Sequence, residues 1–310
     1  MSWLRRCGAI VVVAGVIFSL YYYYTNSLKF NGTDDGGHIT DIISLDREMD
    51  RNYTLPNDSY TWTVQGKAKF EELAYEKENS TTSVTDKVTT HSYQTMYGKF
   101  LYPLLWRAKE TGKPIKFLEI GLGCDMGYGP GKSAKVWQSF WGENAEIWFG
   151  EYAAKCVAAE KSAGRLTGIN VVTGDQSDGN VLSRWLGETG GNFDVIIDDG
   201  GHKNVQIQNT FKVLFEKALN PGGLYFIEDL QVGRTPPFYD KGMNKIPTTE
   251  IIQEWIDQLN IDGFKTKNSA AHEIVYKLPV QLDWIFCQRE ACVIGKCATD
   301  NKRCVDKRGR

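Results

Sequence analysis

The chain has 310 residues, of which 42% are hydrophobic and 24% charged, so it can bury one large core with appendages and is not disordered throughout. The formal net charge is -2, and acids and bases are interspersed along most of the length. This balance argues against a polyanionic partner such as nucleic acid and favours a small or neutral substrate.

The N-terminal segment is apolar enough to enter a membrane. After Arg5 and Arg6 comes an uncharged run of 18 residues, Cys7 to Tyr24, at the lower limit for a membrane span. A cleaved signal peptide is the alternative, but cleavage requires small residues, whereas this run ends in tyrosines typical of an interfacial aromatic belt. We expect residues 1–6 to be a cytosolic tail and residues 7–24 an uncleaved signal anchor. The chain would then be a single-pass type II membrane protein of the endoplasmic reticulum or Golgi, with everything after Tyr24 in the lumen.

Residues 25–85 lack sustained periodicity and are rich in polar residues, which predicts a stem with at most local structure around Trp62 and residues 70–73. This stretch contains all the N-x-S/T glycosylation sequons of the chain, at Asn31, Asn52, Asn57 and Asn79. Chance is the alternative, because Asn, Ser and Thr are abundant in flexible segments. Together with the anchor, the sequons favour a glycosylated lumenal stem.

Residues 86–295 carry short apolar runs that alternate with helical stretches from Pro114 onward. The expected strands are IKFLEI, EIWFG, INVV, FDVIID and GGLYFIED, and helices are expected around residues 134–140 and 153–163. This alternation predicts an α/β fold with a mainly parallel sheet that helices cover on both faces. Near the end, LDWIF and ACVIG predict an antiparallel hairpin that closes the sheet edge.

The C-terminal part of the chain is rich in cysteine, with Cys287, Cys292, Cys297 and Cys304 close together. Their spacing has no C-x-x-C pair and no nearby histidine, so it fits two disulfides better than a zinc site. Disulfides require an oxidising compartment, which agrees with the lumenal topology. We treat residues 296–310 as a cysteine-rich tail.

Ligands of an open α/β sheet bind beyond the carboxyl ends of its strands, so the residues there are candidates for a binding site. Two glycines, Gly121 and Gly123, follow Glu119 where the backbone must turn sharply against a ligand. Glu151 ends the second strand and is placed to accept hydrogen bonds from ribose hydroxyls. A polar turn beside an adenine-sized cleft follows the third strand and contains Asp175 and Gln176.

Two other nucleotide-binding motifs come close to this region. A dehydrogenase motif, G-x-G-x-x-G, requires a third glycine at position 126, which is Met126. A phosphate-binding loop, G-x-x-x-x-G-K-[ST], would end at Gly131, Lys132 and Ser133 and requires a glycine at the same position. Each motif therefore fails by one residue.

The fourth and fifth strands end in a cluster of acids, Asp198, Asp199, Glu228 and Asp229. Crowded carboxylates are costly unless a cation neutralises them, and oxygen-only ligands favour magnesium or calcium over zinc. His202 lies three residues after Asp199 and would sit on the same rim, where it could act as a general base. The alternative is that two of the acids cap helices and His202 packs on the surface. Four acids beside a histidine favour a functional site.

The motifs together resemble a known enzyme family. FLEIGLG, the glycine-rich run leading into SAKVW, GDQSD, FDVIIDDGGH and GGLYFIEDL are similar to the class I S-adenosylmethionine-dependent O-methyltransferases of macrolide sugars, of the mycinamicin and demethylmacrocin type. DKVTTHSYQTMY, residues 86–97, resembles the segment that leads into their catalytic domain. The resemblance therefore spans about residues 86–295.

This resemblance implies a Rossmann-like methyltransferase that binds S-adenosylmethionine and a divalent cation, usually magnesium. The implied base is His202, and either Asp198 or its neighbour could face the metal. The implied metal ligands are Asp199, Glu228 and Asp229. The implied cofactor-binding residues are Tyr93, Glu119, Gly121, Gly123, Ser133, Glu151, Asp175, Gln176 and Asp198.

The chain departs from the family in three places. Lys132 replaces one glycine of the glycine-rich run, an anchor and stem stand where those enzymes have an extra N-terminal domain, and the cysteine-rich tail has no counterpart. We expect an O-methyltransferase that acts on a carbohydrate or glycoside hydroxyl, because two vicinal hydroxyls of a sugar can bind one metal ion as a bidentate ligand. The alternatives are a phenolic diol or lipid acceptor, and a non-catalytic glycoprotein with a methyltransferase fold. The expected partners are a small-molecule or glycan acceptor and the membrane, with no nucleic acid; a homo-oligomer stays open.

Overall fold

The computed structural model describes residues 59–75, 85–240, 246–261 and 275–299. The expected anchor, the glycosylation sequons and Cys304 lie outside these residues. Within the described ranges, no helix combines the length and the apolar character needed to cross a membrane. All the described elements belong to one compact unit, residues 56–310.

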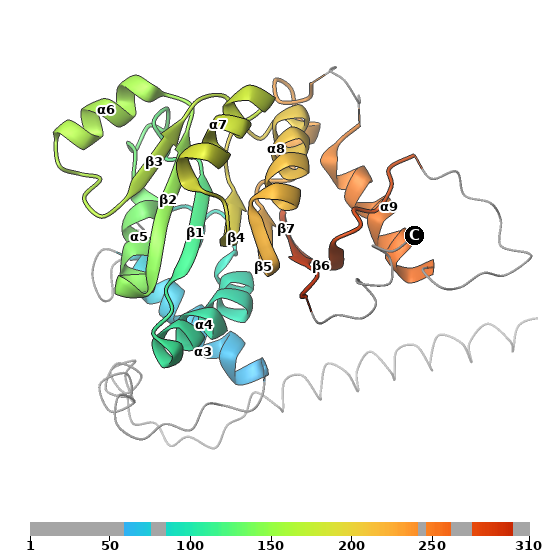
Figure 1. Cartoon of the computed structure of the whole chain (residues 1–310), viewed down its shortest axis with the longest axis horizontal. Helices are drawn as coiled ribbons and strands as arrows, with labels where there is room; N and C mark the ends of the chain where they lie inside the picture. Colours follow the sequence, from blue (N-terminus) through green and yellow to red (C-terminus); the bar gives the residue numbers. More distant parts are fainter. Residues whose placement is uncertain (1–58, 76–84, 241–245, 262–274, 300–310) are drawn as a thin grey trace, which may run out of the picture. The chain divides into compact units, whose positions relative to one another are not determined.

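The unit contains a sheet with helices packed beside it (Figure 1). The parallel strands are β1 (Ile115–Ile120), β2 (Ala145–Glu151), β3 (Asn170–Thr173), β4 (Phe193–Asp198) and β5 (Leu219–Ile227). The antiparallel hairpin consists of β6 (Leu282–Gln288) and β7 (Ala291–Lys296). The strand order is β3-β2-β1-β4-β5-β7-β6. The predicted parallel sheet with an antiparallel hairpin at one edge is therefore confirmed, and its topological switch point lies between β1 and β4.

Side chains of the parallel strands enter two separate cores, because successive residues of a strand point to opposite faces of a sheet. Phe117, Val195 and Ile197 pack in a core that also holds buried residues of α3, α4 and α5. Leu118 and Ile196 pack in a second core with buried residues of α7, α8 and α9. Helices thus cover both faces of the sheet, which explains why the parallel strands are continuous apolar runs.

Two of the described helices precede β1, and the others lie in the connections between strands. On the first face lie α3 (Ser59–Ala74), α4 (Gln94–Thr111) and α5 (Lys132–Trp141), while α6 (Ala154–Ser162) follows β2. On the second face lie α7 (Gly179–Thr189), α8 (Asn204–Lys217) and α9 (Thr248–Ile261). In α7, the Asp178 side chain accepts a hydrogen bond from the backbone of Asn180 at 2.8 Å, and Gly190 in the left-handed conformation ends the helix.

The folded unit begins N-terminal to the expected boundary at Asp86. Helix α3 lies in the range predicted to be a stem and includes Trp62 and residues 70–73, where local structure is predicted. It packs closely on α4, since a Cβ added to Gly66 would lie 2.6 Å from the Cα of Gly98. Phe70 is fully buried in the core. Helix α3 is therefore part of the domain.

Disulfides were expected in the C-terminal part of the chain, and the structure contains disulfides there and elsewhere. Cys287 and Cys292 are bonded across the β6–β7 hairpin, a pairing that their spacing left open. Cys297 is also disulfide-bonded. A further disulfide, Cys124–Cys156, was not predicted and lies at the candidate site.

Candidate functional site

The carboxyl ends of the parallel strands carry the candidate site, as expected for an open α/β sheet. Backbone hydrogen bonds hold the turns in register beyond the strands: Gly121 N donates to Gly150 O at 2.8 Å, and Asp199 N donates to Ile120 O at 3.1 Å. A cavity of about 520 Å³ opens at this edge, within the usual range for small-molecule sites. The predicted site residues that line it are Gly121, Gly123, Ser133, Glu151, Asp175, Gln176, Asp199, His202 and Asp229.

We call the turns after β1, β2 and β3 the glycine side of the site. Gly121 has φ of 104°, and a Cβ at this position would overlap the backbone oxygen of Asp199. Gly174 after β3 has φ of 130°. Because side-chain-bearing residues rarely adopt these conformations, the sequence needs glycine at both positions. The missing Cβ atoms let the turns pack tightly, Gly121 against the backbone of Asp199 and Gly174 against the side chain of Val181.

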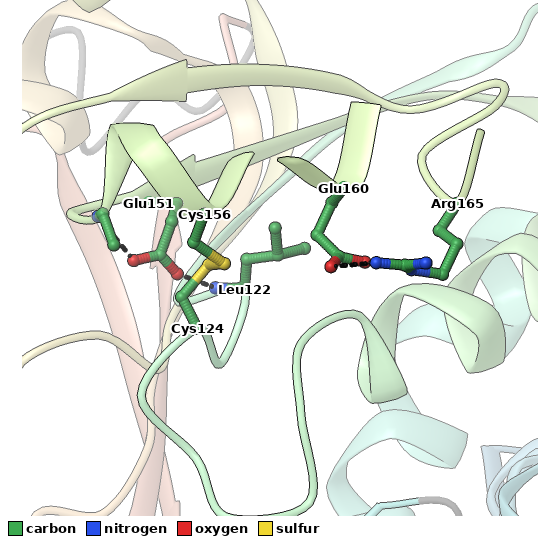
Figure 2. The surroundings of a disulfide bond; sticks show 7 residues. Leu122, Cys124, Glu151, Cys156, Glu160 and Arg165 are labelled. Carbon is green, nitrogen blue, oxygen red and sulfur yellow. Dashed lines mark hydrogen bonds and ion pairs between the residues drawn. A yellow bond between two sulfur atoms is a disulfide. The ribbon is translucent and has the colours of Figure 1, made fainter. Parts of the chain in front are cut away.

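Glu151 forms the wall of the cavity at the end of β2. Its Oε2 accepts a hydrogen bond from Leu122 N at 3.0 Å, and its Oε1 accepts one from Ala153 N at 2.8 Å. Figure 2 shows the carboxylate beside the disulfide between Cys124 and Cys156, which joins the turn after β1 to α6. The carboxylate is therefore fixed from both sides, with the two adjacent turns linked covalently.

Asp175 and Gln176 are neighbours with different roles. Asp175 Oδ1 accepts hydrogen bonds from the backbone N and the Oγ of Ser177, both at 2.8 Å, and closes the turn after β3. Gln176 Nε2 donates to Asp198 Oδ1 at 2.9 Å, and its Oε1 accepts from Gly201 N at 2.9 Å. Gln176 thereby connects the glycine side to the turn after β4.

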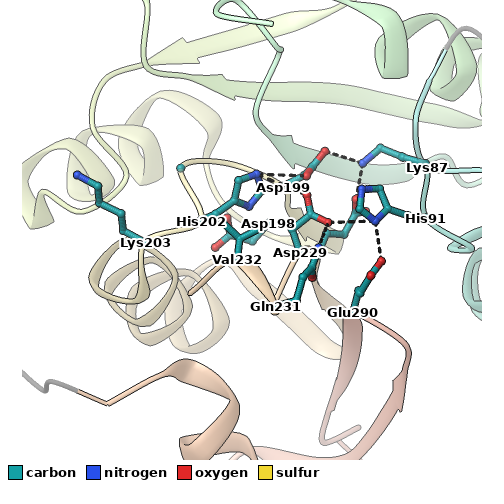
Figure 3. Close-up of polar contacts among 12 residues, drawn as sticks. Lys87, His91, Asp198, Asp199, His202, Lys203, Asp229, Gln231, Val232 and Glu290 are labelled. Atoms are coloured by element: carbon teal, nitrogen blue, oxygen red, sulfur yellow. Dashed lines mark hydrogen bonds and ion pairs between the residues drawn. The ribbon is translucent and has the colours of Figure 1, made fainter. Parts of the chain in front are cut away.

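We call the turns after β4 and β5 the acidic side of the site. Asp198 is 1% exposed, receives a hydrogen bond from Tyr225 Oη at 3.3 Å, and does not line the cavity. Burial raises the pKa of Asp198 to about 6. Asp199, the next residue, lines the cavity and lies beside His202 (Figure 3). Of the two aspartates, Asp199 is thus the one placed to face a metal.

Asp199, His202 and Asp229 form a group that could hold a cation, since each offers one ligand atom and these atoms lie within 4.8 Å of one another. His202 Nε2 is 3.9 Å from Asp199 Oδ1 and 3.7 Å from Asp229 Oδ2. His202 and Asp229 both have positive φ, 55° and 52°. Such backbone conformations are uncommon for residues other than glycine and gather at functional sites.

Glu228, the third metal ligand that the resemblance implies, lies just behind this group and is 1% exposed. Its Oε2 faces Lys87, while its buried Oε1 accepts no hydrogen bond from the described residues. An unpartnered buried carboxylate oxygen is costly and is a position that a cation would satisfy.

Lys87 is a site residue that the sequence interpretation missed. Its Nζ lies 2.5 Å from Glu228 Oε2, 2.7 Å from Asp199 Oδ2 and 3.1 Å from Glu119 Oε1. Burial alone would lower the pKa of Lys87, but the carboxylates outweigh this effect and raise it well above its usual range. Lys87 is therefore an ammonium. Its signal in the sequence is its place in DKVTTHSYQTMY, the segment that resembles the start of the family's catalytic domain.

One ammonium does not neutralise three carboxylates. Burial raises the pKa of Glu119 and of Glu228 to about 7, although Lys87 acts in the opposite direction on both. Near neutral pH these two carboxyl groups are therefore partly protonated, and a divalent cation could take the place of those protons.

Glu119 is fully buried and supports the cavity from behind. Its Oε2 accepts hydrogen bonds from Ser133 Oγ at 2.9 Å and from Trp137 Nε1 at 2.7 Å. It therefore fixes the start of α5, which follows the glycine-rich turn. Lys132, the residue that departs from the family's glycine-rich run, is the first residue of α5 and lines the cavity.

Tyr93, expected beside the cofactor, braces the acidic side instead and does not line the cavity. Its hydroxyl donates to Asp229 Oδ1 at 2.6 Å and accepts from Asp229 N at 3.1 Å. The His91 ring stacks on Tyr93, with its Nδ1 2.7 Å from Glu290 Oε2. Burial would raise the pKa of Asp229, but the hydrogen bond from Tyr93 and the nearby His202 and His91 together lower it. Asp229 is thus held ionised.

Comparison with known proteins finds relatives for part of the chain, although no family model matches it. The 8-demethyl-8-α-L-rhamnosyl tetracenomycin-C 2'-O-methyltransferase of Streptomyces olivaceus is 34% identical over 155 residues, 50% of this chain and 37% of that enzyme. The demethylmacrocin O-methyltransferase of Streptomyces fradiae is 33% identical over 152 residues, 47% of this chain and 35% of that enzyme. The mycinamicin VI 2''-O-methyltransferase of Micromonospora griseorubida is 34% identical over 128 residues, 40% of this chain and 29% of that enzyme. The matched segments thus span between 29% and 37% of the length of these relatives.

Solved structures of the MycE methyltransferase from the mycinamicin biosynthetic pathway share the fold. One crystal form, in complex with Mg and S-adenosylhomocysteine (SAH), has a TM-score of 0.51 and 23% identity, and covers 69% of this chain and 51% of that one. A second form has a TM-score of 0.54 and 20% identity, and covers 87% of this chain and 63% of that one. In sequence and in fold, the chain resembles the class I S-adenosylmethionine-dependent O-methyltransferases of the mycinamicin and demethylmacrocin type.

Proposed function

We propose that this protein is an S-adenosylmethionine-dependent O-methyltransferase, assisted by a divalent cation, that acts on a hydroxyl of a carbohydrate or glycoside. One observation carries the proposal: the glycine side lines one part of a cavity whose other part is lined by the carboxylates of Asp199 and Asp229, with His202 beside them. A methyl donor and a metal-held acceptor would therefore meet within one cavity.

The glycine side fits S-adenosylmethionine. The positive φ of Gly121 keeps the turn after β1 free of a side chain, and the carboxylate of Glu151 is fixed at the wall where ribose hydroxyls would donate to it. The cavity of about 520 Å³ is large enough for a nucleoside with an amino-acid tail. The MycE structure with the same fold contains SAH, which supports this assignment.

The acidic side fits a magnesium ion. Asp199 and Asp229 present carboxylate oxygens at the cavity, and the unpartnered Oε1 of Glu228 is a third candidate ligand. All three are oxygen donors, which magnesium prefers. When bound, the cation would lower the pKa of a coordinated acceptor hydroxyl. The MycE structure also contains Mg.

His202 is our proposed general base. Its Nε2 lies between Asp199 and Asp229, within 3.9 Å of a carboxylate oxygen of each, so it can reach the proton of a hydroxyl held there. As the proton passes to the imidazole, the acceptor oxygen would bond to the methyl carbon of S-adenosylmethionine, whose bond to sulfur breaks to leave SAH. Asp229, held by Tyr93, would stabilise the imidazolium that forms.

A sugar is the acceptor class that these features favour. Two vicinal hydroxyls can chelate one cation, and the Phe238 ring, 6.4 Å from the His202 ring, lines the same cavity. An aromatic face of this kind can pack against the C–H side of a sugar ring. Two of the relatives are named for methylation at a 2' and a 2'' position, and one of these names contains a rhamnosyl group.

The direct test is methyl transfer by the full-length chain to a panel of glycosides, catechols and lipids. We expect turnover with glycosides, loss of turnover on adding a chelator, and its return with magnesium. Asp199→Asn should abolish magnesium binding in calorimetry while SAH still binds. Asp194→Asn is the matched control. Asp194 lies on β4, the strand that Asp199 follows; its Oδ2 accepts a hydrogen bond from Lys116 N at 2.9 Å, and it does not line the cavity.

Three outcomes would count against the proposal. If the chelator does not change the rate of methyl transfer, the metal has no part in the mechanism. Activity confined to catechols or lipids would exclude the sugar acceptor. A folded chain that binds neither S-adenosylmethionine nor SAH would be a non-catalytic protein with a methyltransferase fold.

We further propose that this domain is lumenal, anchored by residues 7–24. The disulfides Cys124–Cys156 and Cys287–Cys292 support an oxidising compartment. Expressed in a eukaryotic cell, the full-length protein should migrate faster after a glycosidase removes N-linked glycans, and changing all four sequon asparagines to Gln should remove that shift. No shift, together with cysteines that alkylate fully without reduction, would overturn the lumenal topology.

A further inference from the structure

Lys87 sits at the junction of three strands. The carboxylates around its Nζ belong to Glu119 at the end of β1, to Asp199 after β4 and to Glu228 after β5 (Figure 3 shows the approach to Asp199). Its side chain is only 2% exposed. The strands β1, β4 and β5 are neighbours in the sheet, so one ammonium contacts both sides of the site.

The contacts of Glu119 carry this connection further. Through its Oε2, Glu119 binds Ser133 and Trp137 at the start of α5, next to the glycine-rich turn. Through its Oε1, it faces Lys87 at 3.1 Å. A continuous polar path therefore runs from α5 on the glycine side, through Glu119 and Lys87, to Asp199 and Glu228 on the acidic side.

The charges explain why a lysine stands here. The buried carboxylates of Glu119 and Glu228 and the partly exposed carboxylate of Asp199 lie at adjacent strand ends and repel one another. Removing the cation from such a cluster leaves uncompensated buried charge. Lys87 is the cation that contacts all three. A divalent cation bound to Asp199 and Asp229 would lie on the cavity side of the same cluster.

We propose that Lys87 is a positioning residue, a built-in counter-ion that assembles the acidic side and joins it to the glycine side before a divalent cation binds. It would hold Asp199 and Glu228 at the geometry that the metal needs, so that the metal meets a formed site. The part that concerns the metal rests on the proposed function. The part that concerns assembly rests on the ion pairs alone.

The test is thermal unfolding of the full-length chain in chelator and in magnesium. In chelator, Lys87→Met should lower the unfolding midpoint by roughly 6 to 20 °C, because it leaves the buried acids without a counter-ion. Magnesium should raise the midpoint of Lys87→Met by more than it raises that of the wild type, since the dication then supplies the missing charge. Lys87→Arg, which keeps the charge, should lose less than Lys87→Met.

Two further variants separate charge from packing. The double variant Lys87→Met/Glu228→Gln removes one cation and one carboxylate together. In chelator, its unfolding midpoint should therefore lie well above that of Lys87→Met. Lys296→Met is the matched control: Lys296 is also buried, but it donates to the backbone oxygens of Phe215, Glu216 and Leu219. Lys296→Met should lower the unfolding midpoint, but magnesium should raise that midpoint by the same amount as it does for the wild type.

The proposal fails if Lys87→Met and Lys296→Met respond equally to magnesium and Glu228→Gln recovers nothing. If Lys87→Met does not fold, folding of the double variant supports the proposal, and failure of both overturns it. If magnesium does not raise the unfolding midpoint of the wild type, the proposed metal site is wrong. The role of Lys87 is then still decided in chelator, by whether Glu228→Gln restores the midpoint of Lys87→Met.

Discussion

The glycine side and the acidic side of the site are built by opposite means. On the glycine side, backbone conformation and covalent links do the positioning: Gly121 and Gly174 have positive φ, Glu151 is bonded to two backbone nitrogens, and Cys124–Cys156 ties the turns. On the acidic side, charged side chains position one another. Lys87 and Tyr93, from the segment before α4, hold the carboxylates there.

This difference teaches how each side should respond to change. A backbone-built side tolerates changes of charge and depends on local chain geometry. A charge-built side depends on the balance of its ions, since each buried carboxylate needs a partner. The acidic side should therefore carry the chemistry and the metal response, while the glycine side should carry cofactor affinity.

The largest expected effect tests the acidic side. His202→Ala should lower the rate constant kcat for methyl transfer by roughly a hundredfold to ten-thousandfold, the usual size of a lost general base. Affinity for SAH and for magnesium, measured by calorimetry, should change little and serves as the folding control. Full turnover of the variant across roughly pH 6 to 9 would assign the base to another group.

The next effect tests the glycine side. Glu151→Ala should weaken SAH binding by roughly tenfold to a hundredfold, because a charged hydrogen-bond acceptor for the ribose is lost. Calorimetry should show an unchanged magnesium affinity. Glu146→Ala is the matched control, since Glu146 lies on the same strand β2 and its side chain is 48% exposed. Equal SAH affinities of the two variants would contradict the division of labour.

A smaller effect tests the covalent link. Replacing both Cys124 and Cys156 by Ser should lower the unfolding midpoint by roughly 4 to 16 °C and SAH affinity by a few-fold, with magnesium affinity unchanged. The control is the same change at Cys287 and Cys292: these residues are 5 apart in sequence rather than 32, so the smaller closed loop should matter less. A wild-type midpoint and SAH affinity without Cys124–Cys156 would show that the backbone alone shapes this side.

Much of the glycine side could be predicted from local sequence. Short apolar runs located β1 to β5 to within a few residues, and the rule that ligands bind at strand ends singled out Gly121, Glu151 and Gln176 before their surroundings were known. The spacing of the C-terminal cysteines also predicted disulfides, and the structure pairs Cys287 with Cys292. These features depend on neighbours in the chain, which a sequence displays directly.

Features that depend on distant partners could not be predicted. Glu119 and Tyr93 were expected at the cofactor, but Glu119 binds Ser133 and Trp137, and Tyr93 binds Asp229, 136 residues away. The disulfide Cys124–Cys156 was missed because its cysteines lie in different βα units. Either of two adjacent aspartates could have faced the cavity, and the pleat of β4 decides between them by burying Asp198.

The sheet, the turn glycines and the set of acids can be read from the sequence, because hydrophobic periodicity and backbone conformation are local properties. The pairing of the acids follows only from the folded chain. Lys87 lies 112 residues from Asp199 and 141 from Glu228 in the sequence, and the order of the strands in the sheet brings them within hydrogen-bonding distance. Electrostatic interactions act through space, so the partners of a buried charge are known only when the chain has folded around it.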